Sequence, residues 1–175
     1  KARGKILATA TVSADRTLAL TGAVQATQQA LARANLKVAD IDLFEVNESF
    51  ASLMLHYMKH LNVPHHKLNV NGGAIALGHA MGSTGSALIG VVLDELERTD
   101  QRRAVVALCG AAGLAVAMVI CGRVGCALAL VGEGEQAATC SMNCCCQRPM
   151  VMLRRGNAKT AVERSSRSAG DVVTL

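Results

Sequence analysis

Residues 69–85, NVNGGAIALGHAMGSTG, form the most distinctive stretch of this sequence. Glycine adopts backbone conformations closed to other residues and lets the chain approach a ligand closely. Gly72, Gly73 and Gly78 are therefore expected to shape a loop. His79 follows directly, just before a helix-forming pattern. The stretch predicts a histidine presented by a loop at the positive end of a helix dipole, where the neutral, basic imidazole is favoured.

A long helix is expected after this loop, over residues 82–98. Apolar residues at helical spacing predict that one face of the helix covers a sheet. These residues are Leu88, Val91, Val92 and Leu96. On the solvated face, Asp94 and Arg98 lie one turn apart and are expected to pair.

The other elements alternate between strands and helices along the chain. Apolar runs bounded by turn residues predict strands at residues 5–12, 41–46, 68–70, 104–108 and 114–120. Helices are expected at residues 21–34, where Asn35 supplies the stop, and at residues 48–61, where Asn47 is a candidate cap. This order of elements predicts an α/β arrangement.

The composition is typical of a globular protein with a single domain. With 175 residues, 51% of them hydrophobic, the chain can bury the core of a single domain. The net charge is +5, but Lys and Arg are scattered, which argues against nucleic-acid binding. The apolar stretch 104–120 is interrupted by Cys109, Gly110 and Gly113, so no membrane span is expected. The amino end lacks a secretory-signal pattern, which favours a cytoplasmic location.

The chain changes character after Ile120. No cysteine precedes Cys109, whereas six follow it, and residues 121–175 mix Arg, Gly, Ser and Cys without clear periodicity. We therefore expect one domain over residues 1–120 and a poorly ordered, atypical tail, for which we hypothesise a shifted reading frame. Reading the other frames beyond codon 120 tests this hypothesis.

Metal binding by the tail is an alternative interpretation of its clustered cysteines. The candidate ligands are Cys140, Cys144, Cys145 and Cys146. Their spacing lacks the paired C-x-x-C that a tetrahedral zinc site usually uses, so no metal site is expected. Zinc analysis of the purified protein decides between the two readings.

Three side chains could carry chemistry. His79 could act as a general base, and Cys109, between an apolar run and GAAG, could exchange a proton with a carbon acid. The amide of Asn47, in VNESFA, could hold a water or a carbonyl oxygen. Each also has an ordinary interpretation: a loop histidine bonded to backbone, an inert buried thiol and a helix cap.

The joint occurrence of these residues makes the chain resemble the C-terminal half of a thiolase. Thiolases carry an NEAFA-type motif, an N-x-NGGAIA-x-GHP-x-G-x-x-G motif and a C-x-G-G-G-x-G-x-A motif. This chain has VNESFA, NVNGGAIALGHAMGSTG and CGAAGLAVA in the same order, and the likeness runs from about residue 5 to Ile120. The resemblance implies a thiolase-like C-terminal domain, with a mixed sheet covered by helices.

The resemblance also implies a role for each candidate. His79 would activate a nucleophilic cysteine and, with a water held by Asn47, form one oxyanion site. Cys109 would be the acid/base that moves the proton at the α-carbon or at the leaving thiol, and the amide of Ala111 would help form a second oxyanion site. Gly72, Gly73 and Gly78 would shape the catalytic loop. The implied reaction cleaves a 3-ketoacyl-CoA with coenzyme A, or runs the reverse condensation, with coenzyme A as substrate and no permanently bound cofactor.

Four alanines depart from the thiolase pattern. Ala80 replaces the proline after the histidine, and Ala111, Ala112 and Ala115 replace glycines of the last motif. Alanine at a position that needs positive φ would be strained and could reduce activity.

The resemblance also indicates missing parts. The acylated cysteine of a thiolase lies in its N-terminal half, and no cysteine precedes Cys109. We therefore expect this polypeptide to be inactive alone and to need an N-terminal half as partner, within a homo-oligomer. The alternative is a catalytically dead thiolase-like module kept for subunit association.

Overall fold

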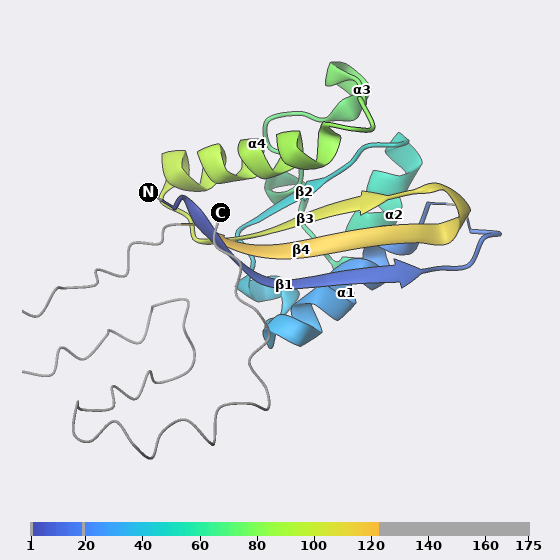
Figure 1. Ribbon diagram of the computed structural model, residues 1–175, viewed down its shortest axis with the longest axis horizontal. Helices are drawn as coiled ribbons and strands as arrows, with labels where there is room; N and C mark the ends of the chain where they lie inside the picture. Colours follow the sequence, from blue (N-terminus) through green and yellow to red (C-terminus); the bar gives the residue numbers. More distant parts are fainter. Residues whose placement is uncertain (1, 19, 123–175) are drawn as a thin grey trace, which may run out of the picture.

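A four-stranded mixed sheet forms the centre of the molecule (Figure 1). The computed structural model describes residues 2–18 and 20–122. The strands are β1 (Gly4–Ser13), β2 (Leu43–Val46), β3 (Arg103–Cys109) and β4 (Leu114–Gly122), in the spatial order β1-β4-β3-β2. β4 pairs antiparallel with both β1 and β3, whereas β2 and β3 are parallel. The expected mixed sheet is confirmed.

Helices cover both faces of this sheet, giving three layers (Figure 1). α1 (Gly22–Ala34) and α2 (Ala51–Leu61) pack on one face, while α4 (Thr84–Thr99) packs on the other. The buried hydroxyls of Thr27 and Tyr57 join α1 to α2 at 2.8 Å. Because helices cover much of both faces of the sheet, its central strands are nearly continuous apolar runs, as the sequence of residues 104–108 indicated. At the beginning of β4, however, Leu114 and Val116 stay exposed.

Short elements connect these layers. They are the 3-10 turns η1 (Val38–Asp40), η2 (His65–Lys67) and η3 (Ala111–Gly113), and the single helical turn α3 (Ala74–Leu77). α3 lies inside the segment expected to be a loop. The strand expected at residues 68–70 is wrong, because it contributes only one isolated parallel bridge, between Leu68 and Phe44.

The beginning of α2 differs from the expectation. We expected a helix from residue 48 with Asn47 as its cap, but the helix begins at Ala51. The backbone N–H of Asn47 donates to the carbonyl of Ala107 at 2.9 Å, so the chain keeps following β3 after β2 has ended. That pairing holds Asn47 outside the helix, and the cap interpretation is wrong.

The ends of α1 and α4 agree with the expectation to within two residues. Asn35 follows α1 in the left-handed conformation (φ 54°), which confirms the predicted stop. Leu88, Val92 and Leu96 of α4 are buried against the sheet, as their spacing predicted. The expected Asp94–Arg98 pair is wrong: Asp94 pairs with Arg3, and Arg98 pairs with Glu95. Arg98 binds Glu95 through two parallel hydrogen bonds, from Nε and from a terminal nitrogen, a geometry stronger than a single ion pair.

β4 continues to Gly122, two residues beyond the domain limit expected at Ile120. The predictions for the remaining tail, including its order and its cysteine cluster, lie outside the described residues. Among the described residues, no helix is long and apolar enough to cross a membrane.

Candidate active site

Asn69 attaches the beginning of the glycine-rich loop to the end of β2. Its Oδ1 accepts from the Val46 N–H at 2.7 Å, and its Nδ2 donates to the Val46 carbonyl at 2.9 Å. This amide thus satisfies both backbone groups of Val46 as another strand would do. The buried side chain of Asn69 is therefore one of the contacts that hold the loop next to β2, together with the bond from the Asn69 N–H to the Phe44 carbonyl at 2.8 Å.

Glu48 holds the next part of the loop and lies directly against Gly73. Its carboxylate accepts from Asn69 Nδ2 at 3.0 Å and from the Ile75 N–H at 3.1 Å. A Cβ on Gly73 would lie 2.3 Å from the Glu48 carboxyl carbon, closer than non-bonded atoms can approach. Gly72 and Gly78 have φ of +82° and +87°, the left-handed region that favours glycine. The prediction that these three glycines shape the loop is consistent with these features.

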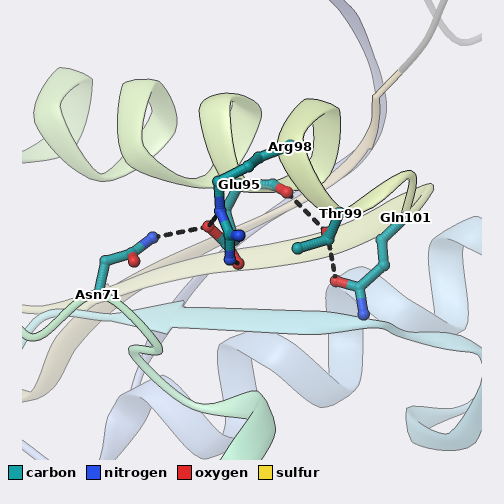
Figure 2. A network of polar contacts seen from close by, with 5 residues as sticks. All are labelled: Asn71, Glu95, Arg98, Thr99 and Gln101. Atoms are coloured by element: carbon teal, nitrogen blue, oxygen red, sulfur yellow. Dashed lines mark hydrogen bonds and ion pairs between the residues drawn. The ribbon is translucent and has the colours of Figure 1, made fainter.

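A second set of contacts attaches the loop to α4 (Figure 2). Asn71 Nδ2 donates to Glu95 Oε2 at 3.1 Å, and Arg98 donates to both Glu95 oxygens, at 2.9 and 2.7 Å. Glu95 is 6% exposed, and its hydrogen bonds from Arg98 and then from Asn71 lower its pKa. Thr99 Oγ1 donates to the Glu95 carbonyl at 2.7 Å. The ionised Glu95 therefore fixes the loop relative to α4, while Asn69 fixes it to β2.

His79 is exposed and bonded in a way that defines its tautomer. Its Nδ1 lies 2.8 Å from Thr84 Oγ1, which itself lies 2.9 Å from the Ala80 carbonyl. A carbonyl only accepts, so the single hydroxyl hydrogen of Thr84 goes to Ala80, and Nδ1–H of His79 must be the donor to Thr84. In the neutral imidazole, Nε2 is then the nitrogen that carries the lone pair. That tautomer is the one that a general base acting through Nε2 needs.

Ala80, where the thiolase motif has proline, closes the same turn. Its carbonyl accepts from the backbone N–H groups of Ser83 and Thr84, each at 2.9 Å. Hydrogen bonds therefore hold the turn that the missing proline ring would have stiffened.

His79 and Asn47 line one cavity of about 520 Å³ at the beginning of α4. Asn47 is 1% exposed, and among the described residues its Oδ1 has no hydrogen-bond partner. A buried acceptor without a partner is costly, and an acceptor at a cavity can be satisfied by a ligand or a water. A larger groove, of about 580 Å³, runs beside α2 and contains none of the three candidate residues.

Cys109 lies half-buried at the end of β3 and contacts Ser49. Its Sγ is 3.3 Å from Ser49 Oγ, which accepts from Asn47 Nδ2 at 3.3 Å. The structure thus brings Asn47 and Cys109 together through Ser49, and Asn47 and His79 together at the cavity. Ala111 is exposed in η3, two residues after Cys109.

Two residues of this site were missed by reasoning from the sequence. Ser49 stands where the NEAFA-type motif has alanine, and this difference in the sequence could have indicated a special role for the residue. Glu45 belongs to the strand expected at residues 41–46; it is 3% exposed and lines the cavity. Burial raises the pKa of Glu45 to about 7, and the nearby charge of Glu48 adds to the shift.

Glu45 should make the stability of the domain depend on pH. Its pKa is higher in the folded state, about 7, than the ordinary 4.5, so the folded protein binds the proton more tightly. The free energy of unfolding should therefore fall as pH rises through this window, by roughly 2 to 3 kcal/mol. In Glu45→Gln this fall should disappear from urea unfolding measured between about pH 5 and about pH 8. Identical pH slopes in the two proteins would contradict the prediction.

Ala112 replaces a glycine of the thiolase motif, and its backbone has the strained conformation that this replacement predicted. Its φ is 59° and its ψ 27°, in the left-handed region, whereas Ala111 and Ala115 have no positive φ. Ala112→Gly should stabilise the domain by up to about 1 kcal/mol, because relief of strain exceeds the added entropy of the unfolded chain. Urea unfolding measures the change. Ala111→Gly is the matched control and should bring no gain; equal effects of both variants would refute the assignment of strain.

The fold and the site define an α/β domain that presents a histidine, a buried amide and a thiol near one end of its sheet. Residues 1–122 match the family model described as thiolase, C-terminal domain. The chain therefore belongs to the thiolase family.

Relatives and solved structures agree with this assignment. The chain is 40% identical to the acetyl-CoA acetyltransferase of Shinella zoogloeoides, over 67% of this chain and 30% of that protein. It is 42% identical to the 3-ketoacyl-CoA thiolase of Aliivibrio salmonicida, over 67% of this chain and 31% of that protein. The crystal structure of the Bacillus anthracis acetyl-CoA acetyltransferase superposes with a TM-score of 0.67 at 30% identity, over 69% of this chain and 31% of that one. The chain thus spans about a third of the length of these relatives.

Proposed function

We propose that this chain carries part of the active site of a thiolase-type acyltransferase, which cleaves a 3-ketoacyl-CoA with coenzyme A or runs the reverse condensation. One observation carries the proposal: His79 Nδ1 is bonded to Thr84 Oγ1 at 2.8 Å, which leaves Nε2 as a base. Asn47 lines the same cavity, and its buried Oδ1 has no hydrogen-bond partner among the described residues. A base and a polar group beside it are what activation of a nucleophile and stabilisation of an oxyanion require.

In the proposed mechanism, His79 Nε2 takes the proton of a nucleophilic cysteine contributed by the remainder of a full-length thiolase. The protonated Nε2 then donates to the thioester oxygen. A water that gives one hydrogen to Asn47 Oδ1 can give its other hydrogen to the same oxygen, so the two donors share the negative charge. Cys109 exchanges the proton at the α-carbon or at the leaving thiol, and the amide of Ala111 contributes to the second oxyanion site.

Acyl-CoA and coenzyme A are the ligands of this proposal, and no permanently bound cofactor is needed. The N-terminal half as partner, assembly into a homo-oligomer and a cytoplasmic location stay predictions from the sequence.

The experiment is to assemble the chain with an N-terminal thiolase segment and to measure cleavage of a 3-ketoacyl-CoA by coenzyme A. The complex should turn over, and the isolated chain should not. A correctly assembled complex that produces no acyl-CoA would overturn the enzyme proposal.

That negative result would favour a second candidate function, a catalytically dead module that serves subunit association. The left-handed Ala112, three residues after Cys109, is the observation in its favour. Restoring glycine at this position in the assembled complex distinguishes a weakened active site, which should regain activity, from a site that has lost its function.

A further inference from the structure

Ser49 is the only side chain that a described hydrogen bond connects to the thiol of Cys109. The two residues lie 60 positions apart in the sequence and meet at 3.3 Å between Oγ and Sγ. Asn47 Nδ2 donates to the same Oγ, also at 3.3 Å. These contacts form a chain from the buried amide at the His79 cavity, through the hydroxyl, to the thiol.

The capacities of these atoms determine the direction of the bonds. Asn47 Nδ2 can only donate, so it occupies one lone pair of Ser49 Oγ. The hydroxyl hydrogen and one lone pair of Ser49 are left for Cys109. When the thiol carries its proton, either atom can donate. After the proton has left, only the hydroxyl can donate, and the bond becomes charge-assisted and stronger.

The hydrogen bond that Asn47 donates to Ser49 strengthens the bond from Ser49 to the thiolate. A hydroxyl that accepts a hydrogen bond becomes a better donor, because neighbouring bonds in a chain polarise one another. The thiolate is the reactive form of cysteine, and hydrogen bonds to that form favour it over the thiol. The hydrogen bond from Ser49 therefore stabilises the thiolate of Cys109 more than its protonated thiol. Cys109 must pass through both forms when it exchanges a proton.

The geometry points to Ser49 as a positioning residue that, with Asn47 behind it, stabilises the thiolate of Cys109 and holds its Sγ in place. A thiolase with alanine at the position of Ser49 lacks this hydroxyl. The hydrogen bond to Cys109 therefore distinguishes this chain from proteins with the NEAFA-type motif. The role in proton exchange rests on the function proposed above, whereas the effect on the thiol does not.

The test measures alkylation of Cys109 by iodoacetamide in the intact chain, as a function of pH. Fragment-ion mass spectrometry separates Cys109 from Cys121, which lies on the same tryptic peptide. Ser49→Ala should slow alkylation near neutral pH by about fivefold, the effect of one ordinary hydrogen bond. The difference should vanish at high pH, where the thiol is ionised in both proteins. A merely structural role of Ser49 would not produce this dependence on pH.

Two further variants complete the test. Ser49→Thr keeps a hydroxyl and should retain most of the wild-type rate, whereas Ser52→Ala removes an exposed hydroxyl of α2 that no described contact involves and should change nothing. An unchanged or faster alkylation in folded Ser49→Ala, or a slowing of equal size at every pH, overturns the inference. Slowed alkylation together with an assembled complex that does not turn over would leave the inference standing and would count against the proposed function.

Discussion

Replacing Gly113 by alanine should destabilise the domain by roughly 3 kcal/mol or more, from overpacking and strain together. Gly113 has a φ of +82°, and a Cβ added there would lie 2.2 Å from the carbonyl oxygen of Ala14. The obstacle is backbone, and it cannot rotate away as a flexible side chain could. The Ala14 N–H also donates to the Gly113 carbonyl at 2.8 Å, so relief of the clash would break a bond between the residue that follows β1 and the η3 turn.

Urea unfolding of the isolated chain measures this loss. Gly90→Ala is the matched control, because Gly90 lies inside α4 and a Cβ there meets nothing within 4 Å. The control should gain about 0.5 to 1 kcal/mol, since alanine is the better helix former. If Gly113→Ala lost no more stability than ordinary surface substitutions do, the close approach of η3 to Ala14 would be wrong.

Replacing His79 by alanine should lower the turnover of the assembled complex by roughly 10²- to 10⁴-fold, the usual contribution of a positioned acid or base. In the proposed mechanism His79 acts twice, since Nε2 activates the nucleophile and then donates to the thioester oxygen. The loss should therefore appear in kcat and much less in KM, because the ground-state substrate does not depend on the base. Steady-state assays with a 3-ketoacyl-CoA and coenzyme A measure both constants.

Thr84 provides the control for the orientation of this histidine. Thr84→Val removes the hydroxyl that accepts from His79 Nδ1 at 2.8 Å while keeping a similar shape. It should reduce kcat less than His79→Ala does, and Thr84→Ser should restore most of the rate. Full activity of His79→Ala would exclude the histidine as the base, whatever the result for Thr84.

The sequence predicted the elements well where their signal was local. The helix of residues 21–34 and its stop at Asn35 follow from helix formers and a left-handed cap, which depend on a few neighbouring residues. The cap interpretation of Asn47 failed for the opposite reason. Its backbone N–H is bonded to Ala107, 60 residues later, and no local pattern contains that bond.

The same distinction divides the site. The glycine-rich loop could be predicted because positive φ favours glycine, and His79 stays a prediction from the motifs that it shares with thiolases. Glu45 and Ser49 were not predicted, since a carboxylate in a strand and a serine after it are ordinary until their surroundings are known. Burial beside α4 raises the pKa of Glu45, and only the folded chain brings Ser49 into contact with Cys109.

Local sequence therefore predicted which chemistry this chain could carry: a base in a loop, a thiol after a strand and an amide between a strand and a helix. The tertiary structure added the partners. The strand order β1-β4-β3-β2 places β2 beside β3, which brings Asn47 and Ser49 to Cys109, and α4 approaches the loop, so that Glu95 meets Asn71. Such contacts depend on strand register and on packing between segments that are distant in the sequence. They therefore cannot be predicted from neighbouring residues in the chain.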